Sequence, residues 1–176
     1  LSARTTDEPF ETSDLSGVFC YTNSMTNKLT LLCATGNSHK FTLGKLAFAK
    51  YDITLEQVMI EVDEIQSEDQ QIILVDKAKK AFTAVRQPVL VSDDSWNIPA
   101  LNGFPGAYMK SMNHWFEPED FIRLMDGKKD RTIYLDQNLA YIDNDGIVTF
   151  NKRLQGIVAK EPKGTTGPPI MHVVEL

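Results

Sequence analysis

Residues 29–40 have the sequence Leu-Thr-Leu-Leu-Cys-Ala-Thr-Gly-Asn-Ser-His-Lys, an apolar run that leads directly into a turn. The run predicts a buried strand over residues 29–34. Phe41, Leu46 and Phe48 then stand among lysines and predict a helix from 38 to about 51. A strand, a glycine turn and a helix in this order indicate an α/β fold.

The same alternation continues along the chain. Apolar residues at helical spacing mark an amphipathic helix over 68–85, and Asp143-Asn144-Asp145-Gly146 is a strong hairpin signal. The further predicted elements are strands 53–62, 89–91, 132–142, 147–159 and 170–175, a loop over 92–106, and helices 107–115 and 118–125. We therefore expect an α/β fold with a mixed β-sheet.

Composition limits the classes of function. The 176 residues fit one domain, or one domain built as two lobes. The net charge of −6 means that the protein has no overall positive charge with which to bind a nucleic-acid polymer. Cys20 and Cys33 have no metal or redox spacing, and no apolar run is long enough to cross a bilayer. We expect a reduced, cytoplasmic protein without a membrane partner. Residues 1–24 are polar and are predicted to be a flexible extension to a domain over 25–176.

The first segment that could form part of a functional site is Thr35-Gly36-Asn37-Ser38-His39-Lys40, between the first strand and the first helix. Gly36 permits a tight turn and close approach of a ligand, and the helix N-terminus behind it is an anion site. Thr35 and Asn37 add side-chain donors, and Lys40 adds a charge for a phosphate. The alternative is a plain capped helix, in which Asn37 or Ser38 is the N-cap.

Two acidic segments follow. Asp63 and Glu64 stand at the predicted end of a strand, where one of them could bind Mg²⁺ through a hard carboxylate oxygen. Asp93 and Asp94 follow the buried strand 89–91, at the edge where open α/β sheets bind their ligands. Paired acids there could hold a metal or activate water. The alternatives are a solvated strand end for the first pair and a loop-capping cluster for the second.

Lysines on the helix between these segments are the remaining candidates. Lys77 is one residue from the apolar stripe and could reach a pocket, whereas Lys80 is expected to be solvated. His39, His114 and His172 are scattered and form no triad or metal set.

In this order and spacing, the segments resemble the Ham1/inosine-triphosphatase family. The family's Thr/Ser-x-Asn-x-x-Lys loop and its helical lysine match Thr35, Asn37, Lys40 and Lys77. The other three matching motifs are Val62-Asp63-Glu64-Ile65-Gln66, Asp93-Asp94-Ser95 with Ala100-Leu101-Asn102-Gly103-Phe104-Pro105-Gly106-Ala107-Tyr108, and Glu161-Pro162-Lys163-Gly164.

The resemblance implies an elongated mixed sheet in two lobes around a central cleft, assembled as a homodimer. It implies Mg²⁺-dependent hydrolysis of ITP, dITP and XTP to monophosphate and pyrophosphate. Thr35, Asn37 and Lys40 would bind the phosphates. Asp94 and Lys77 would be catalytic, and Glu64, Asp94 and Asp93 would bind the metal.

The family continues from its Glu-Pro-Arg-Gly turn into an aromatic-Asp-Pro stretch and then into two further base-recognising segments. Residues 167–171 are Gly-Pro-Pro-Ile-Met instead, and the later segments have no counterpart before Leu176. We therefore expect weaker base discrimination than is usual for the family. Two alternatives remain, a Maf-like pyrophosphatase of other modified nucleotides and a nucleotide-binding module that has lost catalysis.

Overall fold

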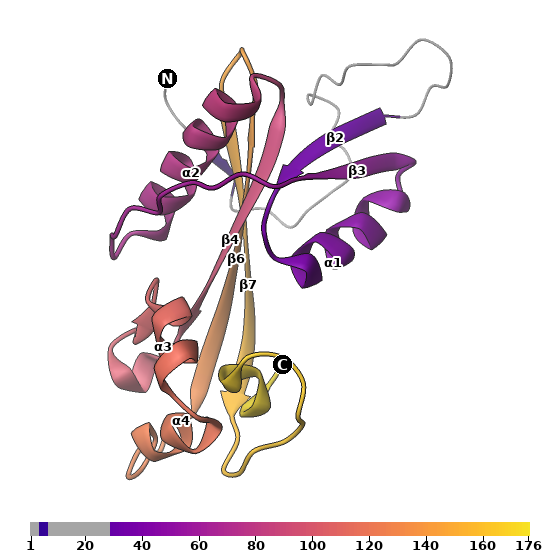
Figure 1. The fold of residues 1–176 in the computed structure, drawn as a ribbon. Coiled ribbons are helices and arrows are strands. Elements are labelled where there is room, and N and C mark those ends of the chain that lie inside the picture. The colour runs from indigo at the N-terminus through magenta and orange to yellow at the C-terminus, as the bar shows by residue number, and fades with distance from the viewer. Residues whose placement is uncertain (1–3, 7–28) are drawn as a thin grey trace. The chain divides into compact units, whose positions relative to one another are not determined.

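The computed structural model describes residues 4–6 and 29–176, in which helices and strands alternate along most of the chain (Figure 1). The strands are β1 (Arg4–Thr6), β2 (Leu29–Ala34), β3 (Ile53–Val58), β4 (Val89–Asn97), β5 (Pro105–Gly106), β6 (Thr132–Ile142), β7 (Ile147–Val158) and β8 (Val174–Glu175). The helices are α1 (Ser38–Ala49), α2 (Gln70–Val85), α3 (Met109–Trp115) and α4 (Pro118–Leu124), with short 3₁₀ helices η2 (Pro99–Leu101) and η3 (Pro169–His172).

The strands form one mixed sheet in the order β1-β7-β6-β4-β2-β3, with β5 paired to β4 and β8 paired to β7. β2 runs parallel to both of its neighbours, and Ala34 lies in register with Val58 of β3 and Val91 of β4. The predicted α/β fold with a mixed sheet is confirmed.

The described residues form two compact units. The first contains residues 4–6, 29–65, 71–93 and 138–151, and the second contains 66–70, 94–137 and 152–176. β4, β6 and β7 each contribute residues to both units.

In the first unit, α1 and α2 cover opposite faces of the sheet (Figure 1). Leu31 and Cys33 of β2 belong to the core against which Phe41 of α1 packs, whereas Ala34 belongs to the core with Leu74 of α2. This division follows from the period of two residues in a strand. Burial raises the pKa of the Cys33 thiol, which keeps it protonated and inert.

The second unit has a separate apolar core formed by β4, β6, β7, α3, α4 and η3. Phe121 is fully buried in it, and its ring lies 5.3 Å from the ring of Phe116. Burial of such a side chain contributes about 1.5–3 kcal/mol. Gly156 is required where β8 pairs with β7, because a Cβ there would overlap the carbonyl oxygen of Glu175.

Most predicted elements are confirmed, but three boundaries are wrong. β3 ends at Val58 rather than at residue 62, and β4 continues to Asn97 through the predicted loop. The extension of β4 is stabilised by antiparallel pairing of Trp96 with Gly106. Residues 170–172 belong to η3 instead of to the start of a strand, because Pro169 in its first turn has the fixed φ that favours the start of a helix.

Part of the predicted extension is described. Residues 4–6 pair in parallel with residues 148–150 of β7. The rest of the 1–24 segment, with Cys20, lies outside the described residues, so its flexibility stays a prediction. Within the described ranges, no helix is long and apolar enough to cross a membrane.

Candidate active site

The candidate site is positioned by the carboxyl ends of β2, β3 and β4. Because Ala34, Val58 and Val91 are in register, the residues that follow them lie at one edge of the sheet. This is the edge at which parallel α/β sheets bind ligands. The loop beginning at Thr35 therefore leaves the sheet at the same edge as the acidic residues of β4.

The loop from Thr35 to Lys40 is a helix cap in the structure. The Asn37 backbone N–H donates to Thr35 Oγ1 at 3.1 Å, and the Lys40 N–H donates to Asn37 Oδ1 at 3.0 Å. Asn37 is thus the N-cap of α1, as the capped-helix alternative predicts. The phosphate-binding roles of Thr35, Asn37 and Lys40 stay predictions.

Gly36 is not explained by backbone strain. Its φ lies outside the left-handed region, and a Cβ added there would meet no described atom within 4 Å. A left-handed backbone is therefore not the reason for glycine here, since the fold itself tolerates a side chain at this position. Close approach of a ligand stays a prediction. Glycine leaves the first turn of α1 uncovered, which keeps its free N–H groups accessible.

Gln57 is a site residue that the sequence analysis missed. Its side-chain Nε2 donates to the backbone oxygen of Thr35 at 2.8 Å, which ties the loop after β2 to the end of β3. The available signal was a polar residue near the carboxyl end of a strand that is otherwise rich in Ile, Leu and Val.

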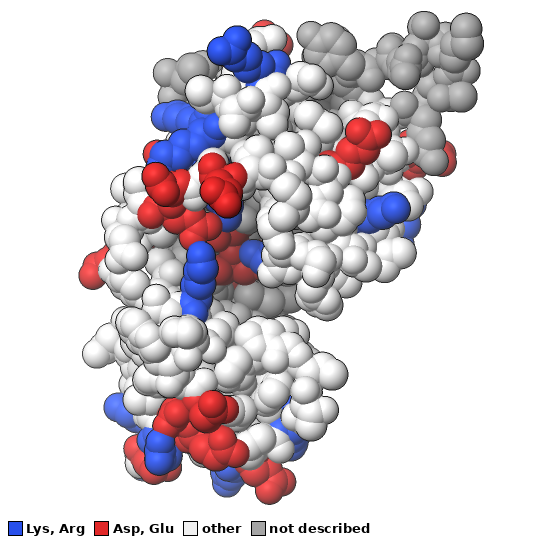
Figure 2. Space-filling model, in the orientation of Figure 1, with Lys and Arg blue, Asp and Glu red and all other residues white. Residues whose placement is uncertain are grey.

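Lys77 brings two of the predicted acids together. Its Nζ lies 3.0 Å from Glu64 Oε1 and 3.8 Å from Asp93 Oδ1. The Lys77 side chain is only 17% exposed, so these charges interact more strongly than surface pairs do. Figure 2 shows acidic and basic side chains gathered side by side on the surface over α2. The cluster of Lys77, Glu64 and Asp93 is called the acid–lysine cluster below.

The prediction that Glu64 stands at the end of a strand is wrong. β3 ends at Val58, and the described residues 59–69 between it and α2 contain neither helix nor strand. Lys80 is also not simply solvated, because its Nζ donates to the backbone oxygen of Asp63 at 2.6 Å. Tertiary contacts to α2 therefore place this segment.

Asp93 and Asp94 lie within β4 rather than in a loop after it. Val91 packs in the core on the α2 side and Leu90 in the core on the α1 side. Strand alternation then directs Asp93 toward α2, where it meets Lys77. Asp94 is the first residue of the second unit within β4.

The Ala100–Gly106 stretch in the second unit contains the end of η2, a turn and the short strand β5. Asn102, Gly103 and Gly106 have φ values of 55°, 92° and 57°. These left-handed conformations favour Asn and Gly, which explains the composition of the motif.

The comparisons with known proteins identify the family. The Ham1 family model matches residues 31–169, which include every predicted site residue. This chain belongs to the Ham1 family.

Among its Ham1 relatives, the dITP/XTP pyrophosphatase of Methanopyrus kandleri is 33% identical over 140 residues, covering 79% of this chain and 74% of that protein. The inosine triphosphate pyrophosphatase 2 of Trypanosoma cruzi is 30% identical over 145 residues, covering 82% of this chain and 72% of that protein.

The solved structures agree on the fold. A HAM1 protein from Coxiella burnetii matches with a TM-score of 0.70 at 18% identity, covering 82% of this chain and 80% of that one. The nucleoside-triphosphatase, dITP/XTP pyrophosphatase, from Mycobacterium abscessus matches with a TM-score of 0.65 at 17% identity, covering 83% of this chain and 81% of that one.

The donor set of this Ham1 family member fits Mg²⁺ that arrives with a phosphate ligand. Glu64 and Asp93 converge on one cation, the Lys77 ammonium, and offer the hard carboxylate oxygens that Mg²⁺ prefers. Across the described part of the chain, no group of three or more His, Cys, Asp and Glu side chains could hold a metal. Mg²⁺ commonly takes one or two carboxylates and completes its shell with phosphates and water.

Proposed function

We propose that this chain hydrolyses non-standard purine nucleoside triphosphates, namely ITP, dITP and XTP, to the monophosphate and pyrophosphate, and so removes them from the nucleotide pool. As a Ham1 family member with dITP/XTP and inosine triphosphate pyrophosphatases among its relatives, the chain is a nucleoside triphosphate pyrophosphatase, a hydrolase that acts on acid anhydrides. The base preference, the metal and the site residues are the finer parts of the proposal.

The observation that carries the proposal is the acid–lysine cluster. Three elements, α2, segment 59–69 and β4, bring Lys77, Glu64 and Asp93 within 3.8 Å at Lys77 Nζ. A cation between two carboxylates suits a triphosphate and its metal, because phosphoryl transfer depends mainly on positioning and charge neutralisation. All three residues lie within the span that the Ham1 family model matches, residues 31–169.

Each side chain has a proposed task. The first turn of α1 binds the triphosphate through free N–H groups, and Thr35, Asn37 and Lys40 add polar and charged contacts. The Lys77 ammonium gives up part of its contact with the two carboxylates and neutralises charge on the phosphates. Glu64 and Asp93 would hold Mg²⁺, which when bound would neutralise the triphosphate and polarise its phosphorus–oxygen bonds.

The reaction needs one activated water. Asp94 orients the water and accepts its proton as the oxygen attacks phosphorus. The anhydride bond between the α- and β-phosphates breaks, and the electron pair leaves with pyrophosphate or with the monophosphate, depending on the phosphorus attacked. Both routes give the same two products.

A cytoplasmic homodimer is part of the proposal and rests on the family resemblance. Light scattering coupled to size-exclusion chromatography tests the assembly, since a dimer has twice the 19.8 kDa mass of the chain.

A substrate panel tests the function. We expect kcat/KM for ITP, dITP and XTP to exceed that for ATP and GTP in Mg²⁺, and EDTA to abolish turnover. A preference for other modified bases would favour the Maf-like alternative. Tight ITP binding without turnover would favour the decayed binding module.

A further inference from the structure

Glu64 is carried by a segment that cannot fix it through backbone geometry alone. The described residues 59–69 contain neither helix nor strand, and the Glu64 side chain is 41% exposed. A catalytic or metal-binding carboxylate requires a position defined to within about 0.5 Å, so contacts outside the segment must hold it.

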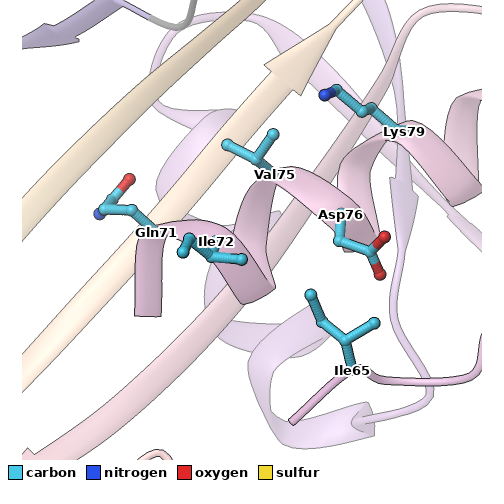
Figure 3. A pocket seen from close by; sticks show the side chains of 6 residues that line it. All are labelled: Ile65, Gln71, Ile72, Val75, Asp76 and Lys79. Carbon is cyan, nitrogen blue, oxygen red and sulfur yellow. The ribbon is translucent and has the colours of Figure 1, made fainter. Parts of the chain in front are cut away.

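Three consecutive residues of this segment meet α2. The Asp63 carbonyl oxygen accepts from Lys80 at 2.6 Å, and Glu64 pairs with Lys77 at 3.0 Å. Ile65 lines a groove beside α2 together with Ile72 and Val75 (Figure 3). Glu64 is thus flanked on both sides by residues that contact one helix.

Lys80 is itself held in place. Its Nζ pairs with Asp76 Oδ2 at 2.7 Å, one helical turn earlier on α2. Both side chains are half-buried, at 35% and 30% exposed. The acid precedes the lysine by four residues, the favourable orientation for a helical ion pair. A lysine fixed by its own helix is well placed to hold the backbone of a neighbouring segment.

We propose that Lys80 is a positioning residue for the pyrophosphatase reaction. Its hydrogen bond fixes the backbone at Asp63, and this directs the next carboxylate, Glu64, toward the metal and triphosphate. The inference rests on the proposed function. Lys80 acts through Glu64, so its loss lowers the affinity for Mg²⁺ in the nucleotide complex more than it lowers kcat at saturating Mg²⁺.

The test uses Lys80→Met, which keeps the chain length and removes the donor. Lys79→Met is the matched control, because Lys79 is the adjacent, exposed lysine of α2. Lys80→Arg is the conservative variant that keeps a cation and a donor. Each protein is assayed for pyrophosphate release from ITP across a Mg²⁺ titration. Calorimetric titration of Mg²⁺ into protein saturated with the non-hydrolysable imido analogue of ITP gives a second readout.

We expect Lys80→Met to raise the half-saturating Mg²⁺ concentration about fivefold in both assays, the size expected for one lost hydrogen bond, with kcat at saturation within about twofold of wild type. Lys79→Met should match wild type, and Lys80→Arg should recover most of the affinity. If Lys80→Met does not fold, Asp76→Asn, which weakens the hold on Lys80, should raise the Mg²⁺ requirement in the same direction.

An unchanged Mg²⁺ requirement in Lys80→Met with a lower melting temperature would overturn the inference and leave Lys80 a structural role. Wild-type protein that releases no pyrophosphate from ITP would instead refute the proposed function. Calorimetry would then decide the inference alone: equal Mg²⁺ affinity of wild type and Lys80→Met, or no binding by either, would overturn it.

Discussion

The ammonium nitrogen of Lys77 lies 3.0 Å from Glu64 Oε1 and links α2, which begins at Gln70, to the 59–69 segment that precedes it. The same nitrogen lies 3.8 Å from Asp93 on β4. One lysine therefore keeps two carboxylates from different elements in the same place. Removing it would leave two like charges facing each other, and substrate phosphates would lose their nearest cation in this cluster.

Lys77→Met should lower kcat/KM for ITP by at least about 100-fold, which corresponds to about 2.7 kcal/mol of transition-state stabilisation. The chain length and apolar stem are retained, so the folded state should persist. Steady-state kinetics with circular dichroism checks both points. A loss of less than about threefold would place Lys77 outside the reaction.

Asp94→Asn should abolish turnover while the fold remains intact, because the change removes the proposed proton acceptor at nearly constant volume. Retention of more than about a tenth of wild-type kcat would limit its contribution to about 1.4 kcal/mol and exclude a catalytic role. Asp93→Asn is the neighbouring comparison, since its carboxylate faces Lys77.

Lys40→Ala should weaken nucleotide binding, and the effect should shrink from ITP to IDP to IMP as phosphates are lost. Calorimetry with the three ligands, using the imido analogue for ITP, checks this order. The N-cap bond uses the backbone N–H of Lys40, which alanine retains, so α1 should stay capped. Equal losses for all three ligands would support the alternative of a plain capped helix.

The ion pair between Arg153 and Asp136 allows the stability of the second unit to be tested separately from catalysis. Arg153 Nε and Nη2 donate to the two oxygens of Asp136 at 2.5 and 2.8 Å, and the guanidinium lies 5.0 Å from the Tyr134 ring centre. This hydrogen bond to Asp136 raises the pKa of Arg153, which stays charged. Asp136 is 9% exposed, whereas the Arg153 side chain is 54% exposed.

Arg153→Met should therefore lower the free energy of unfolding by about 1–3 kcal/mol, because a buried carboxylate loses its charged partner. Adding Asp136→Asn to this variant should restore part of the loss. Urea denaturation of the single and double variants measures both. A double variant less stable than Arg153→Met would show that the unpaired carboxylate is not the cause.

Long amphipathic segments and turn chemistry were enough to predict the fold. Apolar spacing predicted α2, and the Asp143–Gly146 turn predicted the β6–β7 hairpin, because both signals are local. The predicted end of β4 was wrong, because Asp93, Asp94 and Ser95 have low strand propensity. They are part of a strand because β4 pairs with distant residues such as Gly106.

The site was predictable as a set of residues but not as a set of contacts. Motif order pointed to Glu64, Lys77 and Asp93, and the structure joins these three. Gln57 was missed, and Lys80 was wrongly expected to be solvated, because both side chains donate to backbone carbonyls of segments far along the sequence. Such contacts have no sequence period and become visible only after folding.

The most direct test of the account is the product of ITP hydrolysis in Mg²⁺, followed by ³¹P NMR with anion-exchange analysis of the nucleotide. We predict that IMP and pyrophosphate form in equal amounts, and that both are lost when Glu64 is changed to glutamine. Formation of IDP and inorganic phosphate, or undiminished turnover in Glu64→Gln, would contradict it.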